Sequence, residues 1–221
     1  MIRPLTRSAD VGSALEKGWN LYKANFWPIF LATFLTLLVS GATCGICAGP
    51  MLCGLLGMLL ALLRNKDPKP TAGSVFGGFS NFLTSFVTLL VLQMIVFAAS
   101  MILMVVPILG QIAAAALNWA IGPTVVTMAM FFVVDQGATI GEAIGCSIKL
   151  VCEKLFWPIV LVMFVAGLLG GIGMIACGIG LLFTIPLTYC MMVAAYEDVY
   201  GEASCEPSAQ ATEPGALPPA S

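Results

Sequence analysis

The sequence predicts an all-α integral membrane protein: a six-helix bundle of three pseudo-repeated helical hairpins, with amphipathic helices in the membrane interface. Three observations predict this class. Only 9% of the 221 residues are charged and 60% are apolar, whereas a soluble domain carries about 25% charged residues on its surface. The charges lie in clusters separated by long uncharged stretches. Finally, the residues that open the first uncharged stretch recur near the start of the last one.

The uncharged stretches set the number of spans. They cover residues 24–63, 70–134 and 155–196, which are 40, 65 and 42 residues long. One spanning helix needs about 20 apolar residues, so each stretch holds two spans joined by a tight turn. The expected spans are about 26–44, 47–64, 82–106, 111–134, 156–176 and 179–198. The first pair is short, so a re-entrant hairpin over 26–64 that never crosses the membrane stays an alternative.

The cations predict the orientation. All nine Lys and Arg residues fall on one side of the expected spans, and the positive-inside rule makes that side cytoplasmic. We therefore expect a multi-pass protein of the cytoplasmic (inner) membrane, with both termini inside and one transmembrane domain over residues 1–198. Residues 199–221 carry Glu and Pro without a repeating apolar pattern, which is typical of a disordered acidic tail.

Two amphipathic helices are expected on the cytoplasmic side, at 9–24 and 139–154. Each places apolar residues at helical spacing along one face, and Thr139 with Glu142 has the spacing of a capping box at the start of the second. Such helices lie in the interface plane with the apolar face toward lipid. The expected lipid contacts are Lys17, Trp19, Lys23, Trp27, Lys149, Lys154 and Trp157.

The helical hairpins show an internal repeat. Phe26-Trp27-Pro28-Ile29 recurs as Phe156-Trp157-Pro158-Ile159, and a weaker copy of the preceding apolar face runs from Val75 to Phe86. The returning helix of each hairpin carries one proline that shapes it: Pro50, Pro123 and Pro186. They stand 14, 12 and 12 residues before the charged residues that mark the ends of the spans, Arg64, Asp135 and Asp198. The copies share one orientation, so they are parallel repeats about the membrane normal.

With these segments assigned, the chain resembles a family of bacterial six-span membrane proteins. The resemblance lies in ALEKGWNLYKANFWPIF, GEAIGCSIKLVCEKLFWPI, CGIGLLFTIPLTYC and AAYEDVYG, over about residues 10–200. The group includes YciC-like proteins and the membrane domain fused to some glycerophosphoryl diester phosphodiesterases. The resemblance implies the six-span fold, a bacterial inner membrane and an association with lipids. It implies no active-site residue, since the phosphodiesterase domain is a separate unit.

The composition argues against catalysis and cofactors. No charged residue lies centrally in an expected span and the chain has no histidine, so the usual general bases and metal ligands are missing. We expect no enzyme activity, no catalytic residue, no cofactor and no metal. The net charge of −2 also argues against nucleic acid as a partner. Cys44 and Cys47 have motif spacing at an expected exoplasmic turn, where they are either oxidised or small apolar turn residues.

Uncharged polar residues within the spans are the candidate functional groups. They either bond neighbouring helices or line a cavity for a solute; they are Gln93, Asn118, Trp119, Thr184, Thr188 and Tyr189. Small residues at fourth positions indicate close helix packing within the bundle, or a homodimer; these are Gly41, Gly45 and Gly49, Gly167 and Gly171, and Ala116 and Ala120.

Two functions follow from these features. The favoured hypothesis is a non-enzymatic membrane component that is structural, contacts lipid or binds a membrane-protein partner. The alternative is a channel or carrier for an uncharged or amphipathic solute. The alternative predicts that Gln93, Asn118 and Thr188 converge on one hydrated cavity, whereas the favoured hypothesis predicts that they pair with neighbouring helices or lie apart.

Overall fold

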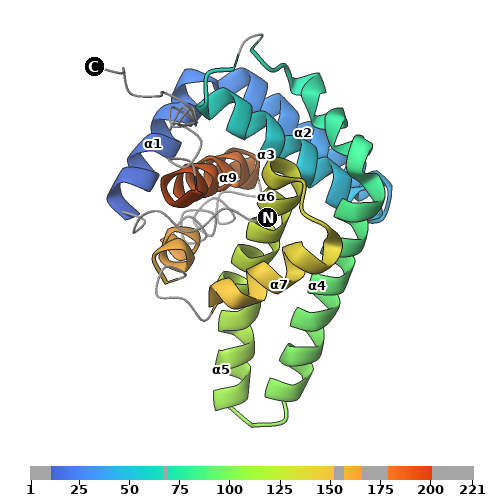
Figure 1. Ribbon diagram of the computed structural model, residues 1–221. Helices are drawn as coiled ribbons and strands as arrows, with labels where there is room; N and C mark the ends of the chain where they lie inside the picture. The colour runs from blue at the N-terminus through green and yellow to red at the C-terminus, as the bar shows by residue number, and fades with distance from the viewer. Residues whose placement is uncertain (1–10, 67–68, 152–156, 166–178, 201–221) are drawn as a thin grey trace, which may run out of the picture.

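The computed structural model describes residues 11–66, 69–151, 157–165 and 179–200, and this part of the chain is helical without strands (Figure 1). The eight α-helices with assigned bounds are joined by two irregular helices, and residues 157–165 form a further helical segment. The elements are α1 Val11–Ala24, α2 Phe26–Ala42, α3 Ala48–Leu63, η1 Ala72–Asn81, α4 Phe82–Leu103, α5 Leu109–Ala116, η2 Leu117–Ile121, α6 Gly122–Gln136, α7 Ile140–Val151 and α9 Ile179–Tyr200.

The first amphipathic helix and the first apolar helix meet at a sharp bend. α1 and α2 are bent by 95° at a short break, which falls at Asn25, just before Phe26-Trp27-Pro28. The buried hydroxyls of Thr33 and Thr36 in α2 donate to carbonyls one turn earlier, at 2.9 and 2.8 Å. These two hydroxyls are thereby satisfied within their own helix, which is how polar groups in lipid avoid being left unpaired.

Turns are present between both pairs of expected spans, and the second begins three residues earlier than the expected spans imply. The chain turns at 43–47, between α2 and α3, with Cys44 and Gly45 at φ values of 51° and 86°. It turns again at 104–108, between α4 and α5. Of the expected capping box at Thr139 and Glu142, the glutamate arm is present: one carboxylate oxygen of Glu142 accepts from the backbone N–H and from the hydroxyl of Thr139, at 3.0 and 2.8 Å.

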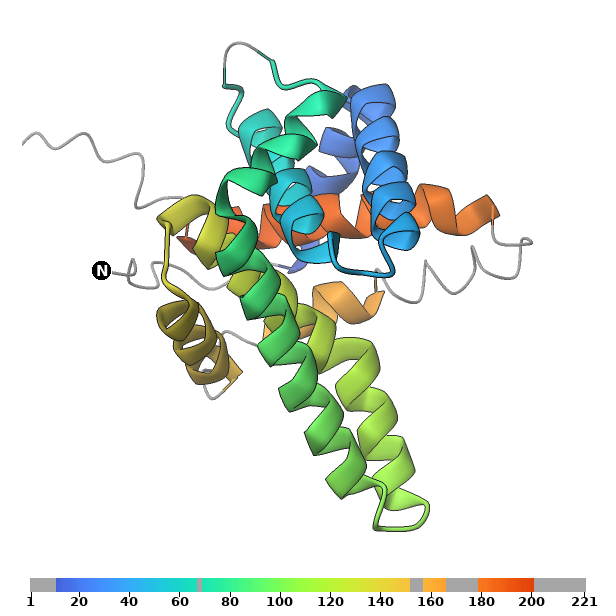
Figure 2. The ribbon, with the colours of Figure 1, turned by 90° about the vertical axis from the view of Figure 1, so that its right-hand side faces the viewer.

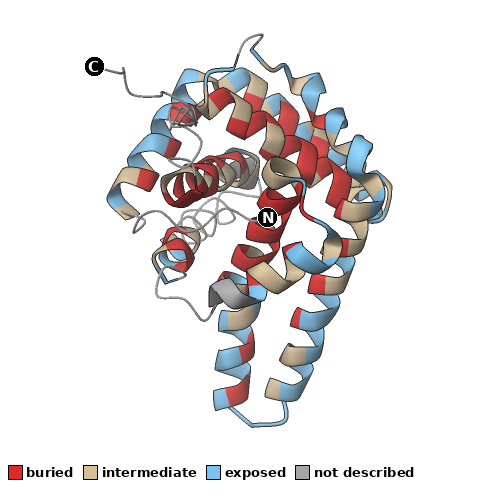
Figure 3. Ribbon diagram, in the orientation of Figure 1, coloured by how far each residue is buried: buried red, intermediate tan, exposed pale blue. Residues whose placement is uncertain are grey.

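The α4–α5 hairpin extends well beyond the other helices (Figures 1 and 2). α4 runs down to the turn, and α5, η2 and α6 return from it. η2 is a single π-helical turn, a feature that occurs inside α-helices and widens the backbone locally. The far part of the hairpin is coloured mostly as exposed or half-buried, while α6 enters the core (Figure 3).

The core lies where α3, α6 and α9 approach one another. Among its largest fully buried side chains are Leu55 of α3, Phe131 of α6 and Tyr196 of α9. The rings of Phe131 and Tyr196 stack with centroids 4.4 Å apart. α9 runs across α2 and α3 rather than alongside them (Figure 2), so the described helices cross obliquely.

α1, η1 and α7 are the helices that precede the three expected hairpins. Each of them packs on the returning helix of another hairpin and not on that of the hairpin it precedes. α1 packs on α9, η1 on α3 and α7 on α6. Backbones touch at two of these interfaces: a Cβ on Gly18 would lie 2.6 Å from Met191 Cα, and one on Gly78 would lie 2.0 Å from Pro50 O. The three contacts form a closed ring in which the first described helix packs on the last.

Two described helical segments are long and apolar enough to cross a membrane, namely Ala72–Leu103 and Leu109–Gln136. A third is added if the bent pair α1 and α2 counts as one span. The chain is therefore a candidate multi-pass membrane protein. α3 is apolar but has only 16 residues, about 24 Å, which is shorter than the hydrocarbon core of about 30 Å. Of the expected third hairpin, residues 157–165 and 179–198 are described, while residues 166–178, which include its turn, lie outside the described residues.

Candidate functional site

Three returning helices end in one cluster of charged side chains. Arg64, the residue after α3, donates to both oxygens of Asp135 in α6, at 2.5 and 3.2 Å. It also donates to both oxygens of Glu197 in α9, through Nε at 3.1 and 3.0 Å and through Nη2 at 2.8 Å. The side chains of Arg64 and Asp135 are only 18% and 7% exposed. One guanidinium therefore joins the ends of two helices to its own.

The cluster continues through Tyr196. Its ring lies in the core, and its hydroxyl donates to Asp135 Oδ2 at 3.1 Å. The same hydroxyl accepts from Gln136 Nε2 at 3.1 Å. Asp135 thus receives hydrogen bonds from both a cation and a phenol, which compensates for removing its charge from water.

A second ion pair lies next to the first along α9. Lys17 of α1 pairs with Asp198, and the hydroxyl of Ser13 donates to Asp198 at 2.9 Å. Lys17 stays about half exposed, whereas the side chain of Asp198 is mostly buried. The successive carboxylates of α9 thus bind different helices, Glu197 the end of α3 and Asp198 the face of α1.

This arrangement is suited to holding helix ends together. Every nitrogen of the Arg64 guanidinium donates to a carboxylate. In the described part of the chain, no group of three or more His, Cys, Asp or Glu side chains could hold a metal ion. Sequence reasoning used Arg64, Asp135 and Asp198 only to mark the ends of the spans. Their similar spacing after the three prolines was the signal that their helix ends occupy equivalent places.

The predicted polar residues of the long hairpin do not converge. Gln93 and Trp119 are exposed on α4 and η2. Asn118 donates to Ser100 Oγ at 2.7 Å and to its own helix at Ala114 O, at 2.8 Å. Asn118 therefore forms a contact between the two arms of the hairpin, which is the behaviour expected of a helix-pairing residue.

The polar residues of α9 lie elsewhere in the molecule. Thr188 donates to the carbonyl oxygen of Thr184, one turn earlier, at 3.0 Å, and Tyr189 is half-buried beside it. Buried hydroxyls in other helices bond backward in the same way, at Thr124, Thr127, Ser100 and Ser147. Those of Tyr22, Ser40 and Thr88 have no such partner, and they lie on three different helices.

The three prolines have different settings. Pro50 is in the first turn of α3, with its carbonyl against Gly78 of η1. Pro123 opens α6 directly after the π-helical turn, and Pro186 lies inside α9. A helix tolerates proline at its first turn, while an interior proline removes a backbone hydrogen bond. The similar sequence positions thus correspond to unlike local structures.

Of the expected lipid contacts, the tryptophans are exposed, whereas one lysine is paired within the protein. Trp27 and Trp157 are 75% and 66% exposed, and Trp19 is also exposed. Lys23 lies over the ring of Trp19, with Nζ 5.2 Å from the ring centroid, while Lys17 is engaged by Asp198. The side chain of Lys149 and all of Lys154 lie outside the described residues.

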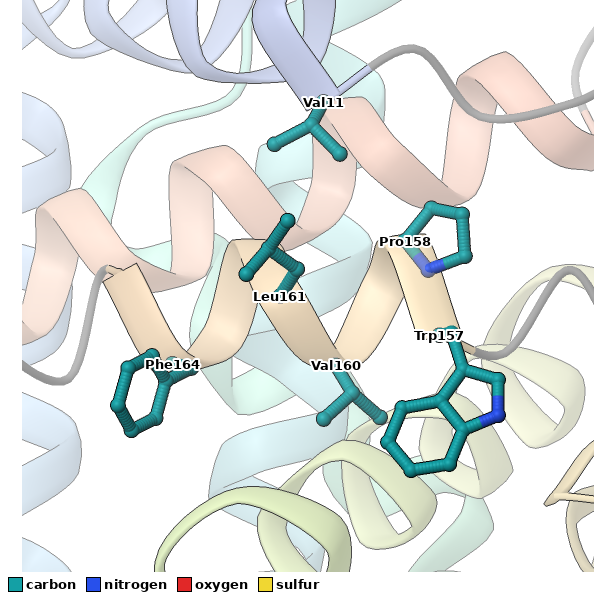
Figure 4. Close-up of a pocket in the computed structure, with 6 residues that line it drawn as sticks. All are labelled: Val11, Trp157, Pro158, Val160, Leu161 and Phe164. Atoms are coloured by element: carbon teal, nitrogen blue, oxygen red, sulfur yellow. The ribbon is translucent and has the colours of Figure 1, made fainter.

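An apolar groove of about 540 Å³ lies between the start of α1 and the helical segment 157–165 (Figure 4). Val11 faces Leu161 and Pro158 across it, and Val160, Trp157 and Phe164 line the same segment. Its walls are almost entirely apolar. None of the predicted polar residues lines it.

The predicted small-residue contacts are confirmed at one position of the first group. A Cβ on Gly49 would lie 2.8 Å from Ser85 O of α4, whereas Gly41 and Gly45 face open space. Gly45 instead supplies the positive φ of the turn. Gly167 and Gly171 lie outside the described residues. Cys44 and Cys47 both carry free thiols.

Comparison of the chain with protein-family models, with curated proteins and with solved structures gives no match. The class of the protein therefore follows from its own helices: an all-helical candidate membrane protein whose ionic cluster gathers the ends of three helices.

Proposed function

We propose that this chain is a non-enzymatic, multi-pass protein of the cytoplasmic membrane that acts through contact with lipid. The observation that carries the proposal is the surface of the long hairpin. Apolar side chains are exposed around both of its arms, among them Met94, Phe97, Ile102 and Ile112. Exposing such a large apolar surface to water is energetically unfavourable, whereas contact with lipid acyl chains is favourable.

The proposal includes six spans in three parallel hairpins, both termini in the cytoplasm, and membership in the six-span group that the sequence resembles. The ring of contacts among α1, η1 and α7 and the returning helices supports the repeat. Gly18 and Gly78 hold matching places in their copies, and each meets the backbone of a returning helix. The chain ends would then share a side with the ionic cluster, next to anionic headgroups.

The alternative of a channel or carrier has less support. Asn118 bonds Ser100 within the hairpin, Gln93 is exposed on α4, and Thr188 bonds its own helix. A solute pathway would need these groups around one water-filled space. A membrane-protein partner or a second copy remains compatible with the exposed surface of α2 and α4.

The test uses the full-length protein in vesicles of phosphatidylethanolamine and phosphatidylglycerol. We expect it to resist extraction by alkaline carbonate and to retain phosphatidylglycerol in native mass spectrometry. Vesicles with the protein should release trapped glycerol no faster than protein-free vesicles. Extraction by carbonate without bound lipid would contradict the membrane proposal, and accelerated glycerol release would favour the channel.

A further inference from the structure

The end of the long hairpin is apolar where a loop would meet water. We define the hairpin tip as residues 104–109, which are the turn between α4 and α5 and the first residue of α5. All six residues are apolar and exposed, with Val105 at 80% and Ile108 at 73%. No charged residue occurs between Pro70 and Val134. The tip therefore offers water neither a charge nor a polar side chain.

The turn itself lacks the residues that suit a loop in water. Ile108 has φ 65° and ψ −66°, and the N–H of Leu109 donates to Pro107 O at 2.8 Å. This three-residue turn is a strained form, and a β-branched residue at positive φ is an outlier. Loops in water favour Gly, Asn or Asp in turns. At this turn, the sequence instead presents the apolar side chains of Pro107 and Ile108.

The length of the hairpin sets how far the tip reaches. From Leu109 to Gln136 the returning arm has 28 residues, or about 42 Å at 1.5 Å per residue. The hydrocarbon core is about 30 Å thick, and the bilayer with its headgroup layers about 40–45 Å. With Asp135 and Gln136 at the near boundary, an upright hairpin ends in the far headgroup layer. A tilt within the usual range of 0–40° moves the tip toward the acyl chains.

We infer that the hairpin tip is a membrane anchor seated against the acyl chains of the far leaflet, and not a loop exposed to water. The inference rests on the proposed function, because the hairpin must lie in a bilayer. Phospholipid acyl chains are the occupants that match a wholly apolar tip at this depth. The hairpin would be held at both ends, by ionic contacts at Asp135 and by lipid at Val105.

The test places one tryptophan at the tip. In full-length protein with its four native tryptophans changed to Phe, Val105→Trp reports the tip and Leu109→Trp provides a second reporter. Phe97→Trp reports the environment of α4, away from the tip. Phe76→Trp reports η1, which precedes α4 at the opposite end of the hairpin. Each variant is reconstituted in vesicles of phosphatidylcholine and phosphatidylglycerol with brominated acyl chains, and is titrated separately with iodide on both sides of the membrane. Circular dichroism confirms that each variant is folded.

We expect brominated lipid to remove more than half of the fluorescence at 105 and at 97, with bromine near the headgroup end most effective at 105. Iodide should quench the reporter at 76 and hardly affect the one at 105. Iodide quenching at 105 with lipid quenching at 97 would overturn the inference and leave the membrane proposal intact. Quenching at 105 by neither agent would also overturn it, because protein would then cover the tip. Absence of lipid quenching at 97 would contradict the proposed function itself.

Discussion

Arg64 and Asp135 are 71 residues apart in the chain and form a two-point contact, in which Nη1 and Nη2 of the guanidinium donate to Oδ1 and Oδ2 of the carboxylate. Glu197 accepts from the other edge of the same guanidinium. The end of α3 is thereby fixed between α6 and α9. The geometry needs a planar cation with several fixed donors, which arginine provides and lysine does not.

Replacing Arg64 should be strongly destabilising. We expect Arg64→Gln to lower the free energy of unfolding by about 2–4 kcal/mol, because it leaves two poorly solvated carboxylates without their cation. Arg64→Lys should restore only part of this loss. Unfolding of the micelle-bound protein by denaturant measures the change. Lys66→Gln, at an exposed position two residues later, is the matched control and should change stability by less than about 0.5 kcal/mol.

Adding Asp135→Asn and Glu197→Gln to the Arg64→Gln variant should recover stability, since it removes the uncompensated carboxylates. A triple variant as unstable as the sum of its parts would argue against the cluster as one unit.

Two neighbouring glycines should respond very differently to alanine. A Cβ on Gly78 would lie 2.0 Å from Pro50 O and 2.5 Å from Gly54 N, whereas one on Gly77 meets nothing within 4 Å. We expect Gly78→Ala to destabilise the protein by about 3 kcal/mol, the upper end for overpacking, because the obstacle is backbone. Gly77→Ala should be nearly neutral. Melting temperatures in one detergent compare the pair, and equal shifts would contradict the close approach of η1 to α3.

The contact between Asn118 and Ser100 should be modest and pairwise. In a double-mutant cycle with Asn118→Ala and Ser100→Ala, we expect a coupling free energy of about 0.6 kcal/mol, the average for hydrogen bonds between membrane helices. Refolding and unfolding in mixed micelles give the four free energies. A coupling near zero would mean that the two side chains act independently, and would reopen a role for Asn118 elsewhere.

The start of α7 should depend on pH. The backbone N–H of Thr139, and secondarily its hydroxyl, lowers the pKa of Glu142 by hydrogen bonding to the charged carboxylate. Since the pKa is lowered on folding, the stabilisation is complete above the unfolded pKa of about 4.3 and is lost as pH falls through the folded value. The protection of the Thr139 amide and its neighbours against hydrogen exchange, measured relative to the intrinsic exchange rate at each pH, should therefore decrease in acid. In Glu142→Gln the dependence on pH should disappear, and an unchanged acid response in that variant would assign it to another group.

Lys17 and Lys23 should contribute unequally to lipid binding. Lys23 lies over the exposed ring of Trp19, while Lys17 is paired with Asp198. We expect Lys23→Gln to weaken retention of phosphatidylglycerol about fivefold, corresponding to about 1 kcal/mol per cation near the surface. Lys17→Gln should have a smaller effect on lipid and a larger one on stability. Native mass spectrometry with both variants measures retention, and equal losses would contradict this division.

The sequence predicted the helices better than their contacts. Charge gaps and apolar periodicity located α1, α2 and α4, because these signals are local, but they placed the turn after α4 three residues too late. They could not reveal that Arg64 contacts Asp135 and Glu197, since a contact between distant residues depends on how helices cross. The pairing of Asn118 with Ser100 was likewise one of two open alternatives. The span assignments of the first and third hairpins stay predictions.

The packing of α1 on α9 has a consequence for biosynthesis. α1 ends at Ala24 and α9 begins at Ile179, so 154 residues intervene between a helix and the partner that covers it. At about 5–20 residues per second, the ribosome needs roughly 8–30 s to make them. During that interval α9 is not yet available, so lipid or a chaperone must contact the apolar face of α1 instead. Assembly of the ring is then completed only when α9 leaves the ribosome, and a transcript truncated before Ile179 would yield the earlier described helices without closure.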